Sequence, residues 1–315
     1  MRDNKIRRKM IMILVIVLCF TYVDKAYADN LLQEDGTKEN PYTINSAEDL
    51  LKFANSVNSG NSYEGKFLVQ TCDIDLEGIE WKTIGSFDSE SSFMGNYNGD
   101  GHIIKNLSVN IGGNNSFFGK LGGIIMNLGI DSGSVMGACV GGITSHSSNP
   151  NAVIINCYNR AMVRGERAGG IADNFNGTIS NCWSECDLQG NSIGGIISYD
   201  AKSIINSISI ENLGRSEVFH DGVEYVDKSN VNYSDVIEKL NSNIYYSAKL
   251  AGIDYHDLNF WELSKDGKQI VFSNDKACIR VKYLNNFLKT VVGSYFPIFI
   301  IISSFCLIVK VIQRT

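Results

Sequence analysis

The stretch VIINCYNRAMVRGERAGGI, from Val153 to Ile171, is followed from Thr178 to Ile196 by TISNCWSECDLQGNSIGGI, which has nearly the same pattern. Both contain Ile-x-Asn, then an apolar residue two positions before a glycine, then Gly-Gly-Ile. A pattern that returns after about 20 to 30 residues is typical of stacked repeat units, each too small to bury its apolar side alone. This repeat decides the fold class.

The three elements of the repeat extend beyond these two copies. The Ile-x-Asn element places its asparagines at Asn106, Asn127, Asn156, Asn181 and Asn206, which are 21, 29, 25 and 25 positions apart. The Gly-Gly-Ile element occurs at 122–124, 141–143, 169–171 and 194–196, and the apolar-x-Gly element at 135–137, 163–165 and 188–190.

The segments between these elements are short, β-branched and separated by Gly, Asn, Ser and Asp, so none is long enough for helical periodicity. The sequence therefore predicts an all-β fold, a parallel β-helix whose coils lie about 4.8 Å apart. We expect the asparagines to occupy one corner as structural residues, in preference to a ligand-binding row. One buried row should contain the isoleucines Ile104, Ile125, Ile154, Ile179 and Ile204.

The two ends of the chain predict membrane targeting. Basic residues, an apolar run and Ala26-Tyr27-Ala28 predict a signal peptide over 1–28, with an uncleaved anchor as the alternative. The apolar stretch 291–312 is long enough for one transmembrane helix, and Lys310 and Arg314 favour a cytoplasmic C-terminus. Residues 29–289 would then lie outside the cell membrane. The formal net charge of −6 argues against a nucleic-acid partner.

Cys157 and Cys182 occupy the same repeat position and should lie in neighbouring coils. Their spacing would permit a disulfide. Buried free thiols are favoured, because Leu107, Leu128 and Ser207 fill the same position elsewhere.

The region before the repeats reads GTKENPYTINSAEDLLKFANSVNSG over 36–60, in which Ser46 is expected to cap a helix, and is followed by YEGKFLVQTCDIDLEGIEWKTIGS over 63–86. With FMGNYNGDGHIIKNLSV over 93–109, this order resembles bacterial surface proteins with GLUG-type repeats. It is similar to the β-helical N-terminal region of immunoglobulin-A metalloproteases. The resemblance covers about 36–214, and implies a right-handed parallel β-helix plugged at one end by the opening helix.

The expected organisation follows from these patterns. It is a signal peptide (1–28), an N-terminal strand and capping helix (29–62), the β-helix (63–214), a small C-terminal cap over its open end (215–280), a juxtamembrane linker (281–290), the transmembrane helix (291–312) and a cytoplasmic tail (313–315). A Trp-containing segment at 260–273 resembles a strand that often follows such repeats.

Proteolysis is excluded, because none of the four histidines begins the His-Glu-x-x-His pattern of a zinc protease. The candidates for chemistry are Asp73 and Asp75 in CDIDL, and Asp100 and His102 in NGDGH. Alternation places both CDIDL carboxylates on one strand face, where they would suit Ca²⁺ or acid–base work. Both motifs also fit the structural pattern of the resembled family, so neither a metal nor a cofactor is predicted.

Tyr158 and Trp183 follow the repeated cysteines. Stacked exposed aromatic rings bind sugars, and the alternative is that the two rings pack over a coil corner. We therefore expect a non-enzymatic cell-surface binding or adhesion module, anchored in a membrane, whose partner is an extracellular glycan or protein. The alternative is a carbohydrate-active β-helix enzyme that uses the CDIDL and NGDGH side chains.

Overall fold

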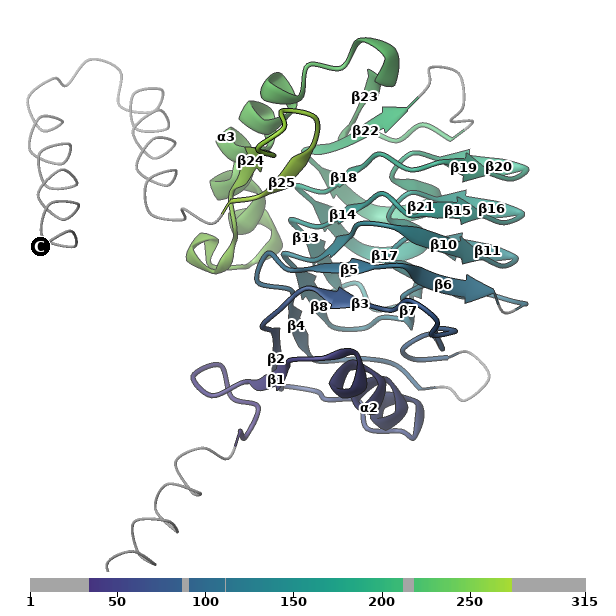
Figure 1. Cartoon of the computed structure of the whole chain (residues 1–315), viewed down its shortest axis with the longest axis vertical. Helices are drawn as coiled ribbons and strands as arrows, with labels where there is room; N and C mark the ends of the chain where they lie inside the picture. Colours follow the sequence, from purple (N-terminus) through teal and green to yellow (C-terminus); the bar gives the residue numbers. More distant parts are fainter. Residues whose placement is uncertain (1–33, 87–90, 111, 212–217, 274–315) are drawn as a thin grey trace, which may run out of the picture.

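The computed structural model describes residues 34–86, 91–110, 112–211 and 218–273. Within them the chain forms an all-β parallel solenoid of about six turns with few helices (Figure 1). Within the described residues every strand pairing is parallel except that of the C-terminal hairpin. The predicted all-β parallel architecture is therefore confirmed.

Four parallel sheets make up the walls. The long sheet contains β1 (Tyr42–Ile44), β2 (Phe67–Gln70), β4 (Asn96–Asn98), β7 (Phe118–Lys120), β8 (Ile124–Met126), β12 (Thr144–Ser147), β13 (Val153–Ile155), β17 (Ala172–Ser180) and β21 (Ile197–Ile205). The seven-stranded sheet contains β3 (Ile74–Asp75), β5 (Ile103–Lys105), β9 (Gly129–Ile130), β14 (Tyr158–Asn159), β18 (Trp183–Ser184), β22 (Ser207–Glu211) and β23 (Val223–Asp227).

The other two parallel sheets complete each turn. The four-stranded sheet contains β6 (Leu107–Asn110), β10 (Gly133–Met136), β15 (Met162–Arg164) and β19 (Leu188–Gln189). The three-stranded sheet contains β11 (Cys139–Gly141), β16 (Arg167–Gly169) and β20 (Ser192–Gly194). Corners between them are tight, since a Cβ on Gly169 would lie 1.7 Å from the carbonyl oxygen of Ala172.

A row of isoleucines runs up the inside of the long sheet. Ile125 pairs with Ile154, Ile154 with Ile179 and Ile179 with Ile204. The first three are fully buried, whereas Ile204 is half-buried at the end of the row. The row buries apolar surface that no single turn would bury alone, which is the main source of stability in a solenoid.

The prediction that Ile104 belongs to this row is wrong. Ile104 lies in β5 of the seven-stranded sheet, between Ile74 and Ile130, and Tyr97 precedes Ile125 in the row. Asn106 is likewise at another corner and donates to Asp75 Oδ1 at 2.8 Å. The tripeptide Ile-x-Asn suits two different corners of the turn, so the motif alone does not identify the corner.

The Gly-Gly-Ile element has the same ambiguity. Residues 122–124 lead into β8, where Ile124 pairs with Val153. The later copies lie elsewhere in the turn, since Gly141, Gly169 and Gly194 pair with one another in the three-stranded sheet. The first copy is therefore out of register with the other three.

An asparagine ladder follows the corner between the long and seven-stranded sheets. In each bond the side-chain Nδ2 of one asparagine donates to Oδ1 of the asparagine in the preceding turn. The bonds are Asn127 to Asn98 at 2.8 Å, Asn156 to Asn127 at 2.8 Å and Asn181 to Asn156 at 2.9 Å. The φ angles at the five repeat asparagines are all between 47° and 56°, in the left-handed region that asparagine tolerates. The predicted structural role of the repeat asparagines is confirmed.

Helix α2 (Ala47–Asn58) covers the first turn (Figure 1). Ser46 Oγ accepts a hydrogen bond from the Asp49 N–H at 3.1 Å, which is the predicted cap. The buried residues of α2 join the interior of the solenoid; they are Leu50, Phe53, Ala54 and Val57. The helix therefore closes that end of the apolar core.

The C-terminal part differs from the expected end cap. Strand β23 extends the seven-stranded sheet, but 3₁₀ helix η1 (Lys228–Asn230), α3 (Tyr233–Ala251), η2 (Tyr255–Asp257) and the hairpin β24 (Trp261–Leu263) with β25 (Ile270–Phe272) follow it. In Figure 1, α3 and the hairpin lie along the flank of the solenoid. They pack on outward-facing apolar side chains of both the long and the seven-stranded sheets.

The apolar segments at the two ends lie outside the described residues, so the signal peptide (1–28) and the transmembrane helix (291–312) stay predictions. None of the helices within the described ranges combines the length and apolar character that a membrane crossing requires.

Candidate functional site

A groove of about 1100 Å³ separates the solenoid from the C-terminal hairpin. We call it the hairpin groove. Its acidic and basic lining residues are Asp73, Asp100, His102, Lys105 and Asp131 from the solenoid, and Glu262, Lys265 and Asp266 from the hairpin. Three of the four residues predicted from CDIDL and NGDGH therefore meet here, whereas Asp75 is not among the lining residues.

The local sequence explains why these side chains meet. In CDIDL, Ile74 is buried in the core, so Asp73 and Asp75 on either side of it face outward, as predicted. The NGDGH turn has Asp100 at φ 48° and Gly101 at φ 86°, and it leads directly into β5. Because β5 pairs with β3, His102 lies beside Asp73.

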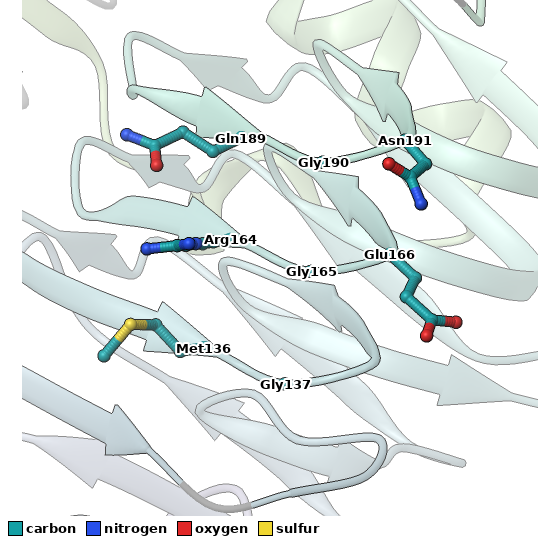
Figure 2. Close-up of a pocket in the computed structure, with 8 residues that line it drawn as sticks. All are labelled: Met136, Gly137, Arg164, Gly165, Glu166, Gln189, Gly190 and Asn191. Atoms are coloured by element: carbon teal, nitrogen blue, oxygen red, sulfur yellow. The ribbon is translucent and has the colours of Figure 1, made fainter.

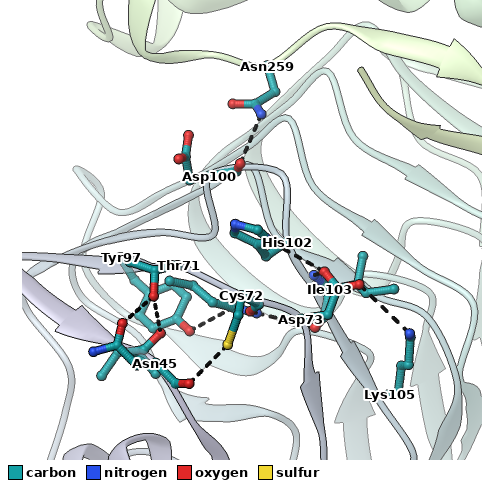
Figure 3. A network of polar contacts seen from close by, with 12 residues as sticks. Asn45, Thr71, Cys72, Asp73, Tyr97, Asp100, His102, Ile103, Lys105 and Asn259 are labelled. Carbon is teal, nitrogen blue, oxygen red and sulfur yellow. Dashed lines mark hydrogen bonds and ion pairs between the residues drawn. The ribbon is translucent and has the colours of Figure 1, made fainter. Parts of the chain in front are cut away.

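Asp73 is paired with its neighbours. Its Oδ1 lies 3.3 Å from His102 Nδ1 and 3.3 Å from the Ile103 nitrogen, which donates to it. Its Oδ2 lies 3.8 Å from Lys105 Nζ. Figure 3 shows His102, Ile103 and Lys105 arranged around this one carboxylate. The carboxylate is therefore balanced by local donors.

Asp75 has a similar structural setting. Its Oδ1 accepts from Asn106 Nδ2 at 2.8 Å and from the Glu77 nitrogen at 2.9 Å. These bonds, the one from Asn106 first, lower the pKa of Asp75 below its usual value. A general acid at neutral pH needs the opposite shift, so Asp75 is unsuited to donate a proton.

Asp131 also lines the hairpin groove and is less exposed than Asp73. Tyr158 Oη donates to Asp131 Oδ1 at 3.0 Å, and Arg160 Nη1 lies 3.4 Å from the same oxygen. Burial, together with the negative charge of Asp131, raises the pKa of Tyr158. The phenol therefore stays protonated and acts as a fixed donor.

The hairpin supplies the opposite wall. Asn259 Nδ2 donates to the Asp100 carbonyl at 3.0 Å, which holds the hairpin against the NGDGH turn (Figure 3). Glu262 accepts from Ser273 Oγ at 2.8 Å. The contribution of Asn259, Glu262 and Asp266 was missed in the sequence. The alternation in Trp261-Glu262-Leu263 was the available signal, but it does not reveal which surface the hairpin covers.

The expectation of exposed aromatic contacts at Tyr158 and Trp183 is wrong. The two rings stack at 4.5 Å with an interplanar angle of 7°, but they are 1% and 0% exposed. Trp261 lies edge-on to both, at 6.1 Å from Tyr158 and 6.0 Å from Trp183. Their outer surface is covered by the hairpin, so the packing alternative describes them.

The stacked thiols match the favoured prediction. Cys157 and Cys182 are both buried and both free. Each sulfur lies near a carbonyl oxygen of its own turn, Cys157 Sγ at 3.2 Å from Ile155 O and Cys182 Sγ at 3.3 Å from Ser180 O. Burial raises the pKa of Cys157 well above its usual value, so the thiol is not a nucleophile at neutral pH.

A second, shallower hollow lies on the far edge of the solenoid, with a volume of about 530 Å³. Figure 2 shows that three successive turns line it in the same way. Met136, Arg164 and Gln189 pair across the four-stranded sheet, and each is followed by a glycine. The hollow therefore results from the repeat. The three turns contribute a thioether, a guanidinium and an amide at the same position.

Across the described part of the chain, no three His, Cys, Asp or Glu side chains come together in a group that would hold a metal ion.

No protein-family model matches the chain. It is 32% identical over 153 residues to "Halomucin" of Haloquadratum walsbyi, covering 44% of this chain and 2% of that protein. It is also 32% identical over 126 residues to a "Putative Gly-rich membrane protein" of Evansella cellulosilytica, covering 38% of this chain and 14% of that protein. The chain thus spans only a small share of either relative.

Among solved structures, the chain is similar to one described as "a putative immunoglobulin A1 protease from Bacteroides ovatus". The TM-score is 0.49 and the sequence identity 20%, over 76% of this chain and 94% of that one. No match concerns GLUG-type repeats, so that part of the resemblance stays a prediction.

Proposed function

We propose that the protein is a membrane-anchored extracellular solenoid that binds a surface glycan or protein without chemical turnover. In this proposal the solenoid winds to the right, the signal peptide directs export, and the helix at 291–312 holds the solenoid at the outer surface. Its C-terminus lies in the cytoplasm. The hairpin groove is the binding site.

One observation carries the non-enzymatic reading: the carboxylates nominated for catalysis are held by local partners. Asp73 contacts His102 and Lys105, and Asp75 is tied to Asn106. Acid–base hydrolysis of a glycan needs one carboxyl with a raised pKa and a second that activates water or attacks. Asp75, with its lowered pKa, does not fit the first role.

The names of the two relatives support a surface location. One is called a membrane protein and the other a halomucin, and their matched segments are about half the length of this chain or less. The solenoid fold is compatible with such a module, because its regular walls present side chains in repeated rows.

The test of function combines binding and turnover on one sample. The full chain in lipid nanodiscs is titrated with a panel of neutral and acidic polysaccharides by calorimetry, and released reducing ends are measured on the same samples. We expect binding of at least one polymer and no release. Release that is lost in Asp73→Asn, with folding unchanged, would establish the carbohydrate-active enzyme instead.

A matched control comes from a second His–Asp pair. His256 Nδ1 lies 2.8 Å from Asp254 Oδ1 on the surface, and neither residue lines the hairpin groove. Asp254→Asn removes the same type of contact without touching the site. We expect Asp73→Asn and His102→Ala to change groove binding, and Asp254→Asn to leave it at the wild-type value.

The proposed topology is tested separately. Protease added to intact protoplasts should remove the region 29–289 and spare an epitope tag fused after Thr315. Loss of the tag in intact cells would reverse the orientation.

A further inference from the structure

An exposed tyrosine lies under a fixed arginine on the solenoid wall. Tyr199 in β21 is 57% exposed, and the guanidinium carbon of Arg167, from β16 in the preceding turn, lies 4.6 Å from its ring centroid. Neither residue lines the hairpin groove. We call the pair the Tyr199 platform.

A buried carboxylate fixes the arginine. Nε and Nη2 of Arg167 donate to the two oxygens of Asp173 at 2.8 and 2.7 Å, and Asp173 is 2% exposed. Ser198 Oγ donates to the same carboxylate at 2.8 Å. These two bonds use two of the five guanidinium N–H donors. The side chain is one-third exposed, so solvent reaches part of the guanidinium although Asp173 holds it.

A bulge sets the direction of the tyrosine. Ala172 pairs with Ile197 and Asn174 with Asp200, so β21 has one more residue than β17 between these two pairs. Ser198 turns inward to Asp173 and is 1% exposed, whereas Tyr199 next to it is exposed. Bulges re-aim side chains beside binding sites. The register shift therefore lies directly at Tyr199, whose ring is exposed.

A cation and an aromatic ring in contact often only stabilise a surface. Here the arginine has a buried anchor in Asp173, and the ring of Tyr199 keeps more than half of its surface in water. An open ring face packs against the C–H face of a pyranose. The guanidinium lies over the other face of this ring, and its exposed edge can pair with a carboxylate.

We propose that the Tyr199 platform binds a hexuronate unit of an acidic polysaccharide, with the sugar ring on Tyr199 and its carboxylate on Arg167. This inference rests on the proposed surface-binding function but places the contact outside the hairpin groove. Repetition along a polymer, and many protein copies on one membrane, would add the avidity that a single shallow contact lacks.

Polygalacturonate is the probe, titrated against the full chain in nanodiscs by calorimetry. Tyr199→Ala should weaken its binding about tenfold, because it removes the ring on which the sugar packs; tenfold corresponds to about 1.4 kcal/mol. Arg167→Lys keeps the charge but loses the planar fork, and should have a similar effect. Tyr199→Phe should bind as the wild type does. Methyl-esterified polygalacturonate, the same polymer without free carboxylates, should bind at least tenfold more weakly than the acid form.

Tyr246→Ala is the matched control, since Tyr246 on α3 is 54% exposed and lies under no arginine of the described residues. Unchanged polygalacturonate binding in both Tyr199→Ala and Arg167→Lys would overturn the platform. Loss of binding in Asp73→Asn instead would assign the polymer to the hairpin groove, so that the proposed function stands and this inference fails. No binding of any polysaccharide in the panel would refute the platform and the glycan form of the proposed function together.

Discussion

Two arginines lie over aromatic rings on different faces of the solenoid. On the flank, Arg160 lies 5.3 Å from the Tyr158 ring and 5.6 Å from the Trp183 ring, and all three side chains are buried or nearly so. On the wall, Arg167 lies 4.6 Å from the ring of Tyr199, which is 57% exposed. Both places have an arginine over an aromatic ring. They differ in whether another segment of the chain covers the rings and excludes water.

The covering comes from far along the chain. Trp261 and Phe272 lie over the flank rings although they follow Trp183 by many tens of residues. The wall pair has no such partner among the described residues that contact it. A position within the turn therefore determines the direction of a side chain, but a distant segment determines whether water reaches it. The flank aromatics contribute to stability and the wall aromatic is available for binding.

The largest expected effect is on the flank. Trp183→Ala should lower the free energy of unfolding by about 3–5 kcal/mol, because it removes a fully buried ring and leaves a cavity. Tyr199→Ala should change it by less than about 0.5 kcal/mol. Urea denaturation of the full chain in detergent micelles measures both. Equal effects of the two substitutions would contradict the division between flank and wall.

A second substitution removes the cover itself. Trp261→Ala should cost about 3 kcal/mol and open the flank rings to solvent. Acrylamide quenching of the remaining tryptophan fluorescence should then rise, since Trp183 becomes accessible while Trp81 stays in the interior. Leu263→Ala on the same hairpin is the control, because Leu263 is already exposed. Unchanged quenching in Trp261→Ala would show that the hairpin does not protect Trp183.

The asparagine ladder offers a smaller contrast between its middle and its end. Asn156 donates to Asn127 and to the Asn259 carbonyl, and accepts from Asn181. Asn156→Ala should therefore cost about 2 kcal/mol, since it leaves buried polar partners unpaired. Asn206 lies one turn beyond the last bond of the ladder, and its Nδ2 donates to Ser247 Oγ at 3.0 Å. Asn206→Ala should cost about 1 kcal/mol. Thermal unfolding of both variants measures this, and a larger loss at Asn206 would contradict it.

The smallest effect is electrostatic and concerns Asp75 near the hairpin groove. Folding lowers the pKa of Asp75 through hydrogen bonds from Asn106 and then from the Glu77 N–H. Its carboxylate therefore stabilises the fold above the unfolded pKa of about 3.9, and this contribution is lost as the pH falls through the folded pKa. Asp75→Asn should lower Tm slightly at pH 7 and match the wild type in strong acid. Glu77→Gln controls for the loss of one charge, and a Tm gap that persists in strong acid would contradict the assignment.

The repeat predicted most of the interior. The row of Ile125, Ile154, Ile179 and Ile204, and the pairing of Val135, Val163 and Leu188, follow from regular spacing alone. The early turns were harder, because Ile104 and Asn106 repeat the local pattern at a different corner. A three-residue motif indicates only the backbone conformation of a corner. Two different corners of this turn contain an asparagine in the left-handed conformation, so the motif does not distinguish them.

The candidate site was predicted only from the solenoid side. Alternation placed Asp73 outward, and the NGDGH turn brought His102 beside it. The opposite wall of the groove was not predictable, since local patterning of the hairpin says nothing about where it docks. For the same reason, Tyr158 and Trp183 were predicted as exposed contacts although the hairpin buries them. The bulge beside Tyr199 could not be predicted either, because the spacing of the repeat does not reveal it.

The asparagine ladder also has a consequence for how this protein can evolve. In most repeat proteins each unit contacts only its neighbours, so a unit can be added without disturbing distant contacts. Here the backbone from 257 to 259 bonds to Asn127 and Asn156, and Ser247 of α3 bonds to Asn206. These contacts join one flank segment to several specific turns, so they require a fixed spacing between those turns. A duplicated or deleted turn between Asn127 and Asn206 would separate these bonded groups, so docking of the flank segment requires the present number of turns between them.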